Sequence, residues 1–361
     1  MNLLKKLFLL SLLSGVVSIA YANAQQGVVD FTKKQEVRKF INRLCSEDDF
    51  NKQELNRLFC RIEIQESSLK YYTPAKKTKP KKKRKAKTSK KKRKPRQGSW
   101  TLYEKKLLNR HRVSGGVAFM IEHRDTLAKA EKIYGVPPEY ITAVIGIESH
   151  YGRYAGKYPV LDTLATLAFE KNRRNRFFRN ELREYLKMTR REELDPKDVN
   201  GSFAGAIGLG QFMPSNFEKL GIDFDKDGKV RIGQPADAIG SIANYFKKSG
   251  WRKGEPVATR VSYKGMRFKR LKTGYKHKYH RKNLKGIYPK KRFRYNAPVR
   301  LIKLDRSRYD ELWYGTRNFY VITRYNHSSY YAMAVHQLAQ KIKKETILAT
   351  KKRYDYIASV K

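Results

Sequence analysis

A glutamate beside an apolar stripe is the first residue whose surroundings indicate chemistry. Glu148 follows three apolar residues at helical spacing, on the same side of the expected helix. They are Ile141, Val144 and Ile145. A carboxylate that faces apolar neighbours loses hydration, so we expect its pKa to be raised, as the proton-donating acid of a glycosidase requires. The alternative is a structural glutamate that is buried and either capped by a helix or paired with Arg153.

A short acidic run indicates a second kind of site. Asp223, Asp225 and Asp227 precede a glycine, and the segment matches the first half of an EF-hand loop. The twelfth position is Gln234 instead of glutamate, and Asp237 lies three residues further on. Aspartates this close repel one another unless solvent or a cation neutralises them. The run predicts a calcium site, with an acidic surface turn as the alternative.

The elements that must position these residues are mostly helical. Pro137 and Pro138 mark the start of the helix that carries Glu148, and Gly152 marks its end. Periodicity predicts helices over Phe119–Tyr134, Glu139–His150, Leu161–Phe169, Arg176–Lys187, Ala236–Lys248 and Tyr331–Lys344. From Val257 the pattern changes to short β-prone runs.

The formal charge of +48 is concentrated in two tracts. Residues 76–96 hold fifteen basic residues and residues 256–304 hold seventeen, with no acid in either. Such a chain attracts polyanions. Its 40% hydrophobic content excludes disorder of the whole chain, but the low-complexity segment 73–98 is predicted to be a disordered linker.

Aromatic residues interleave with the basic residues of the second tract. They are Tyr263, Phe268, Tyr275, Tyr279, Tyr288, Phe293 and Tyr295. In a cytoplasmic protein this pattern would indicate single-stranded nucleic-acid binding, which the export signal described next disfavours. We expect either a β-subdomain with a solvated basic face or a surface that attracts anionic peptides or acidic glycolipid of the cell envelope.

The amino terminus resembles a secretory signal. Lys5 and Lys6 precede an apolar run over residues 7–20, and residues 22–24 (Ala-Asn-Ala) supply a cleavage site. The run is short for a membrane span, so we expect cleavage, with a retained anchor as the alternative. No cysteine precedes Cys45 to take a lipid, and no later segment is long and apolar enough to span a membrane. These features predict a periplasmic protein without a transmembrane segment in the mature chain.

Two cysteines lie near a predicted helical hairpin. The expected helices are Gln35–Leu44 and Lys52–Gln65, and Cys45 and Cys60 are the only cysteines of the chain. In an oxidising compartment an even pair predicts a disulfide, with two buried thiols as the alternative.

Several motifs together resemble a known family. Residues 148–152 (Glu-Ser-His-Tyr-Gly) resemble the E-S-x-Y-G signature of the lytic murein transglycosylases with lysozyme-like folds, and the later motifs resemble the B-type branch. Those motifs are Leu161–Phe169, Arg173-Arg174, Gly201–Ala206, Gly208–Ser215, Asp237–Tyr245 and Thr323–Ser328. They stand in the family's order and approximate spacing between Gly98 and Lys341.

The resemblance implies an α+β fold, predominantly α, with a lysozyme-like catalytic core, a helical N-terminal part and a small β-subdomain. The expected divisions are a signal peptide (1–24), a helical hairpin (25–72), a basic linker (73–98), the catalytic core with its calcium loop (99–255), a basic β-subdomain (256–305) and a C-terminal segment that completes the core (306–361).

The resemblance also implies a role for each candidate residue. Glu148 would be the sole catalytic acid and base, while Ser202 and Gln211 would hold substrate N-acetyl and hydroxyl groups. The glycan groove would be lined by Tyr245, Tyr325, Asn326 and Tyr331, and the peptide stem would be contacted by Arg173 and Arg174. The alternative for Ser202 is a structural role in a turn, and the alternative for Tyr325 is a structural role in the core. The calcium ligands would be Asp223, Asp225, Asp227, the carbonyl of Lys229, and Asp237.

The implied reaction cleaves the glycosidic bond between N-acetylmuramic acid and N-acetylglucosamine and leaves a 1,6-anhydro end, with no cofactor for catalysis. Asp162 and Glu170 are candidates for a second carboxylate, but each fits a helix start or a surface better. A muramidase that hydrolyses the same bond and a cell-wall or polyanion-binding protein are the alternatives. The expected partner is the peptidoglycan glycan strand, and nucleic acid is not expected.

Overall fold

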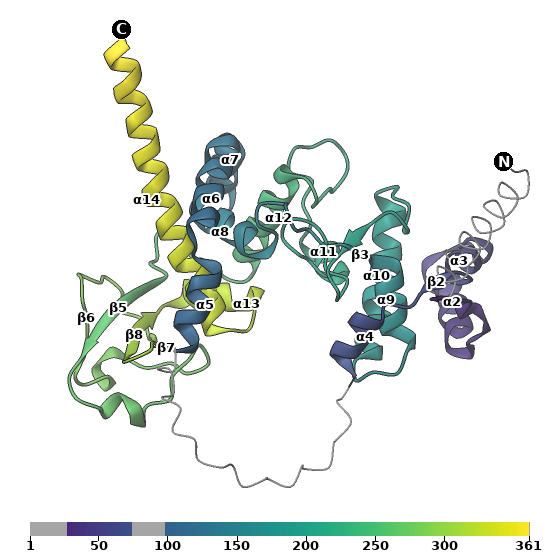
Figure 1. The fold of residues 1–361 in the computed structure, drawn as a ribbon, viewed down its shortest axis with the longest axis horizontal. Coiled ribbons are helices and arrows are strands. Elements are labelled where there is room, and N and C mark those ends of the chain that lie inside the picture. Colours follow the sequence, from purple (N-terminus) through teal and green to yellow (C-terminus); the bar gives the residue numbers. More distant parts are fainter. Residues whose placement is uncertain (1–26, 74–97, 361) are drawn as a thin grey trace, which may run out of the picture. The chain divides into compact units, whose positions relative to one another are not determined.

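The structure, a computed structural model, describes residues 27–73 and 98–360. The chain forms two compact units. Among the described residues, the first unit contains 27–73, 157–206 and 213–215, and the second contains 98–156, 207–212 and 216–360. The predicted signal peptide and residues 74–97 of the predicted linker lie outside the described residues. Both units are mainly helical, as expected (Figure 1).

The first unit is a helical body with two short antiparallel strand pairs. Its helices are α2 (Gln35–Asp48), α3 (Lys52–Phe59), α4 (Glu66–Tyr72), α9 (Val160–Phe169) and α10 (Asn175–Arg191). The strand pairs are β1 (Val28–Val29) with β2 (Ile62–Glu63), and β3 (Tyr158–Pro159) with β4 (Asn200–Gly201). Its centre holds edge-to-face rings from Phe31, Phe40, Phe59 and Phe169. Burial of these large rings stabilises the unit.

The predicted disulfide between Cys45 and Cys60 is wrong in this structure, because both residues are free thiols. The predicted hairpin forms, but its first helix runs on to Asp48 and its second ends at Phe59 instead of Gln65. Cys45 therefore lies within α2, one position after the buried Leu44. Cys60 ends α3, and its Sγ donates to the Arg57 carbonyl at 3.4 Å. Both thiols are partly exposed, so the buried-thiol alternative is wrong as well.

The second unit surrounds one buried helix. Its helices are α5 (Ser99–Leu107), α6 (Arg110–Glu122), α7 (Arg124–Tyr134), α8 (Pro138–Glu148), α12 (Pro235–Lys248), α13 (Arg317–Tyr325) and α14 (Ser329–Val360), and α11 (Pro214–Leu220) contains the last boundary between the units. Helix α8 packs against α6, α7, α12 and α14 (Figure 1). Every residue from Glu139 to Gly146 is buried, which fixes α8 as the centre of this unit.

One helix that the sequence predicts in this unit is divided into two helices in the structure. The periodicity over Phe119–Tyr134 predicts a single helix, but α6 ends and α7 begins at His123. The backbone of His123 (φ −104°, ψ 26°) leaves the helical region. Both helices keep an apolar face toward the same core, so the apolar pattern continues across the break and hides it.

The β-prone tract forms a small antiparallel sheet in the order β6-β5-β8-β7. The strands are β5 (Ala258–Tyr263), β6 (Ile287–Pro289), β7 (Arg300–Asp305) and β8 (Asp310–Gly315). Strand β8 lies beyond residue 305, the predicted end of the subdomain. It nevertheless belongs to the same sheet, because it pairs with β7 along its whole length. Among the helices of the described residues, none has the length and apolar character needed to cross a membrane.

Aromatic residues of the basic tract build the core of this subdomain. Phe268 and Tyr295 are buried in its hydrophobic cluster, and Tyr263, Tyr279 and Phe293 pack against it. Most lysines and arginines of the tract are exposed, whereas Arg300 is buried. For these five aromatic residues the interleaved pattern therefore reflects a folded core, whereas Tyr288 of the same tract is exposed.

Candidate active site

Glu148 is the last residue of α8, where the helix leaves the buried core. Pro138 begins the helix in the first turn, where its missing N–H costs no hydrogen bond. The side chain of Glu148 is partly exposed, and the Tyr331 hydroxyl donates a hydrogen bond of 2.6 Å to its Oε1. Burial raises the pKa of the Glu148 carboxyl to about 7, and the hydrogen bond from Tyr331 offsets part of this rise. No ion pair with Arg153 forms in the described structure.

The turn after α8 holds Glu148 in place through an unusual backbone. His150 (φ 53°) and Tyr151 (φ 61°) adopt the left-handed region, which side-chain-bearing residues rarely enter. The Tyr151 hydroxyl donates to the Arg112 carbonyl at 2.6 Å, and the Tyr151 ring occupies the space where a Cβ of Gly146 would stand. Packing of the ring thus supports a strained turn, as is common at functional sites.

Three tyrosines form an aromatic wall next to Glu148. The rings of Tyr325 and Tyr331 stack with centroids 6.4 Å apart, and Tyr245 lies 4.8 Å from Tyr325. The Tyr245 hydroxyl donates to the Arg324 carbonyl at 2.5 Å, which ties α12 to α13. Asn326 follows α13 and is exposed. The structure therefore brings Tyr331, at the start of α14, into contact with the carboxyl and places Tyr325 and Tyr245, from the ends of α13 and α12, beside it. Proximity of Asn326 to Glu148 stays a prediction.

Gln211 forms hydrogen bonds within the protein that the sequence analysis did not predict. Its backbone is left-handed (φ 50°), and its Nε2 donates to the carbonyls of Ala155 (2.7 Å) and Gly208 (3.0 Å). The Tyr325 hydroxyl donates to the neighbouring Gly210 carbonyl, which ties this loop to the aromatic wall. These bonds orient the amide, so Oε1 is the atom of Gln211 left to accept a hydrogen bond from a ligand.

The other predicted binding residues, Ser202, Arg173 and Arg174, belong to the first unit. The Ser202 Oγ accepts hydrogen bonds from the backbone N–H groups of Ala204 (3.3 Å) and Ala206 (3.0 Å), so it has the turn role left open above. The Arg174 guanidinium lies 4.0 Å from the Phe177 ring centroid, while Arg173 is exposed. Their contact with substrate stays a prediction.

The candidates for a second carboxylate have structural roles in the first unit. Asp162 lies in the first turn of α9 and accepts a hydrogen bond from the Glu63 backbone N–H at 3.2 Å. Glu170 pairs with Lys34 at 2.5 Å. Burial raises the pKa of Asp162 to about 6. These positions agree with the assignment of both residues to a helix start and a surface.

Tyr103 is a site residue that sequence reasoning missed. It lies on α5, and its pKa is raised by burial and by the negative charge of Glu148. Its ring stacks 6.0 Å from Trp100 and lies 5.8 Å from Tyr330. The spacing of Trp100 and Tyr103, three residues apart on one helix face, was the available signal, but it indicates burial as readily as a site.

The acidic loop gathers carboxylates as expected. The side chains of Asp223, Asp225 and Asp227 each bring an oxygen within 4.8 Å of the others. Asp237 is buried, and its two oxygens accept backbone N–H groups of Phe224 (2.7 Å) and Arg231 (2.6 Å). Burial raises the pKa of Asp237, and the charges of Asp225 and Asp223 raise it further.

This donor set fits calcium. Several carboxylate oxygens at flexible spacing suit a hard divalent cation such as Ca²⁺, whereas Mg²⁺ requires a tighter octahedron. Asp227 also pairs with Arg231, so a bound cation would compete with this ion pair. Among the described residues, the structure thus brings three predicted ligands together and places Asp237 at the base of the same loop.

Comparison with known proteins shows the family. Residues 32–340 match the family model described as the Transglycosylase SLT domain. The chain is 39% identical over 325 residues to membrane-bound lytic murein transglycosylase B of Escherichia coli, covering 89% of this chain and 86% of that protein.

Solved structures agree with this relationship. The Escherichia coli lytic transglycosylase Slt35 in complex with calcium has a TM-score of 0.79 and 37% identity, covering 90% of this chain and 98% of that chain. SltB3 from Pseudomonas aeruginosa in complex with NAG-anhNAM-pentapeptide has a TM-score of 0.68 and 25% identity, covering 86% and 79%. The chain therefore belongs to the Transglycosylase SLT domain family, as a lytic murein transglycosylase similar to the B-type enzymes.

Proposed function

We propose that this lytic murein transglycosylase uses Glu148 as its single acid and base. The observation that carries the proposal is the position of Glu148 at the end of the buried helix α8, with a pKa of about 7 and a hydrogen bond from Tyr331. A group with this pKa is protonated in a large share of molecules near neutral pH and can still act as a base. The engagement of Asp162 and Glu170 in other contacts supports a mechanism with one carboxyl group.

The reaction then proceeds in two proton transfers. Glu148 protonates the oxygen of the β-1,4 bond between N-acetylmuramic acid and N-acetylglucosamine, and the bond to C1 breaks to give an oxocarbenium-like sugar. The carboxylate next removes the proton from the C6 hydroxyl, whose oxygen bonds to C1. The attack is intramolecular, so high effective molarity replaces the second carboxylate of other glycosidases. The product is a 1,6-anhydro end, and no water is consumed.

The surrounding residues position the glycan. The aromatic wall of Tyr245, Tyr325 and Tyr331 offers apolar faces to sugar rings and limits water near the carboxyl. Gln211 Oε1 and the exposed Asn326 offer polar atoms to hydroxyl or N-acetyl groups. We assign the same kind of contact to Ser202, and contact with the peptide stem to Arg173 and Arg174.

We also propose that the loop from Asp223 to Asp237 holds a structural calcium ion. Asp223, Asp225, Asp227 and Asp237 would supply carboxylate oxygens, and Lys229 would supply its carbonyl. The bound ion would neutralise the crowded carboxylates and lock the loop that precedes α12. The complex of Slt35 with calcium supports this proposal.

The place of action that we propose is the periplasm. The secretory signal predicted for residues 1–24 and the murein substrate of the related enzymes support export. The partner is the peptidoglycan glycan strand, and the basic face of the β-subdomain would favour approach to an anionic envelope surface.

A substitution pair tests the catalytic assignment. Glu148→Gln keeps the shape of the side chain but cannot transfer a proton, so turnover of purified murein should fall by about 10³-fold or more. Asp162→Asn is the matched control: it also replaces a partly buried carboxyl by an amide and keeps the acceptor for Glu63, so turnover should stay within about twofold of the parent. Release of soluble muropeptides measures both. Near-normal turnover in Glu148→Gln would overturn the assignment.

A further inference from the structure

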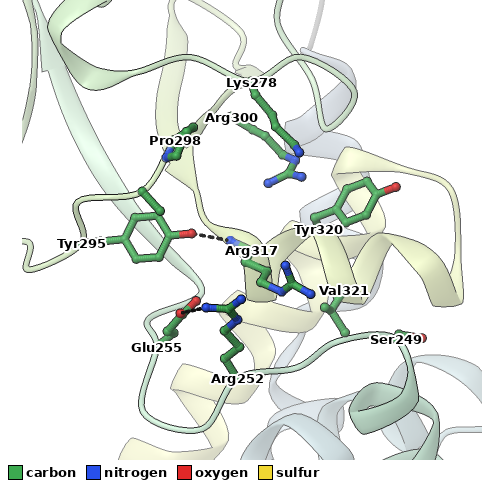
Figure 2. A pocket seen from close by; sticks show the side chains of 11 residues that line it. Ser249, Arg252, Glu255, Lys278, Tyr295, Pro298, Arg300, Arg317, Tyr320 and Val321 are labelled. Carbon is green, nitrogen blue, oxygen red and sulfur yellow. Dashed lines mark hydrogen bonds and ion pairs between the residues drawn. The ribbon is translucent and has the colours of Figure 1, made fainter.

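A cavity of about 260 Å³ in the second unit is lined mainly by cationic and aromatic side chains. It lies beside the loop after α12, the segment before β7 and the first turn of α13. Figure 2 shows its principal side chains: Arg252, Lys278, Arg300, Arg317, Tyr295 and Tyr320. Neither the catalytic cluster nor the acidic loop contributes to it.

Arg300 is the buried member of this group, with 4% of its surface exposed. Its Nε donates to the Tyr275 carbonyl at 2.8 Å, its Nη1 donates to the Thr316 carbonyl at 3.1 Å, and its guanidinium lies 4.3 Å from the Tyr320 ring centroid. No carboxylate of the described residues forms an ion pair with it. A buried guanidinium without an anionic partner is costly, because arginine does not deprotonate in proteins.

Neighbouring cations increase this cost. Burial lowers the pKa of Arg300, and the positive charge of Arg317 lowers it further. Arg317 donates from Nε to the Gly250 carbonyl at 3.0 Å, and within the described ranges neither Arg317 nor Lys278 pairs with a carboxylate. The carboxylate that lines the cavity, Glu255, pairs with Arg252 at 3.5 Å (Figure 2). Three cations in the cavity, the buried Arg300 and the exposed Arg317 and Lys278, thus have no carboxylate partner among the described residues.

The first turn of α13 adds to the positive potential. The Thr316 side chain does not cap this helix, and the Arg317 backbone N–H donates to the Tyr295 hydroxyl at 3.1 Å inside the cavity (Figure 2). The positive end of the helix dipole therefore lies at the cavity wall. Guanidinium groups together with a helix N-terminus are the groups that proteins use to hold oxyanions.

We propose that this cavity binds a phosphate group, either as the free ion or as a small phosphate ester. A phosphate monoester carries close to two negative charges near neutral pH and offsets three cations better than a single carboxylate does. It also presents enough oxygens to accept hydrogen bonds from the remaining N–H groups of two guanidinium groups and from an ammonium group at once. At about 30 Å³ per water molecule, the cavity has room for a phosphate and several waters.

The phosphate site is separate from the proposed catalytic function. Helix α13 carries the cavity residues at its start and Tyr325 at its end, and nine residues of helix extend over roughly 13 Å. Binding can therefore be measured directly, without an activity assay, and its failure would leave the role of Glu148 untouched.

Calorimetric titration of the purified protein with inorganic phosphate, at constant ionic strength set by sodium chloride, tests the proposal. We expect saturable binding of one phosphate per chain. Lys278→Gln and Arg317→Gln should each weaken it by about tenfold, the effect of losing one charge-assisted hydrogen bond. Lys282→Gln is the matched control, because Lys282 is an exposed lysine of the same subdomain outside the cavity, and it should bind phosphate like the parent.

Other probes identify the source of the phosphate and the outcomes that overturn the site. Tighter binding of glycerol phosphate than of inorganic phosphate would identify an ester as the ligand, and the reverse order would identify the free ion. Equal affinity for acetate would overturn the preference for phosphate. Unchanged phosphate affinity in both folded cavity variants, Lys278→Gln and Arg317→Gln, would overturn the site itself.

Discussion

Glu148 and Arg300 present the same physical problem in two regions of the second unit, and the protein solves it differently in each. Both are ionisable groups that burial has removed from most of their water, and neither forms an ion pair with a described residue. The carboxyl can relieve the cost by binding a proton, and its pKa rises to about 7. The guanidinium keeps its charge and is left with carbonyl oxygens and one tyrosine ring.

The difference shows how burial of a charge leads to two kinds of function. A group that can lose its charge becomes an acid that exchanges protons near neutral pH. A group that cannot lose its charge is stabilised by an oppositely charged ligand, as we propose for Arg300. The acidic loop at Asp223, Asp225 and Asp227 is a third case, in which carboxylates crowd near the surface and a bound cation would neutralise them.

The largest effect that separates these cases is the pH dependence of catalysis. Because Glu148 must be protonated to start the reaction, kcat/KM should fall about tenfold per pH unit above a pH of about 7. Tyr331→Phe removes the hydrogen bond that favours the carboxylate, so the falling limb should move to higher pH. Initial rates on purified murein from pH 5 to pH 9 measure both. A limb that stays in place in Tyr331→Phe would contradict the contact between the two residues.

A smaller effect concerns stability. The folded-state pKa of Glu148 is above its unfolded value, so the folded state loses stability as pH rises from about 4.5 to about 7. Glu148→Gln removes this loss and should be more stable than the parent at pH 8 by about 1–3 kcal/mol, with little difference at pH 4. Thermal melts at both pH values measure it. An equal gain in stability at both pH values would show that burial does not raise the pKa of the Glu148 carboxyl.

The third effect concerns the stability that the acidic loop gains from calcium. Calcium that binds only the folded state should raise the melting temperature by a few degrees, since 100-fold excess over Kd stabilises by about 2.7 kcal/mol. Asp227→Ala should abolish this rise, while Asp125→Asn, which alters an exposed aspartate outside the loop, should keep it. Melts in calcium and in chelator check both. Coinciding curves for the parent would remove the site.

Sequence reasoning predicts the catalytic helix because its signal is local. The apolar stripe, Pro138 and the placement of Glu148 all act within one helix, and α8 forms as expected. The partners of Glu148 come from distant segments, so Tyr331 was reached only through family resemblance, and Tyr103 on α5 was not reached at all. Contacts between such segments depend on tertiary packing, which no local pattern encodes.

The basic tract, residues 256–304, shows what composition alone cannot predict. Its composition predicts a solvated or ligand-binding surface, but composition cannot tell an exposed arginine from the buried Arg300. It also cannot tell a stacking aromatic from a core aromatic such as Phe268. The disulfide prediction failed for a related reason, because spacing alone does not show that Cys45 lies within α2.

Product analysis in labelled water tests the central claim most directly, namely that a single carboxyl group cleaves murein without water. Purified protein would digest murein in ¹⁸O-enriched water, and mass spectrometry would measure the new muropeptide ends. The account predicts 1,6-anhydro ends that are one water lighter than hydrolysed ends and carry no ¹⁸O above background. Reducing ends that carry one ¹⁸O per cleavage would contradict it, because a water molecule would then have attacked C1 in place of the C6 hydroxyl.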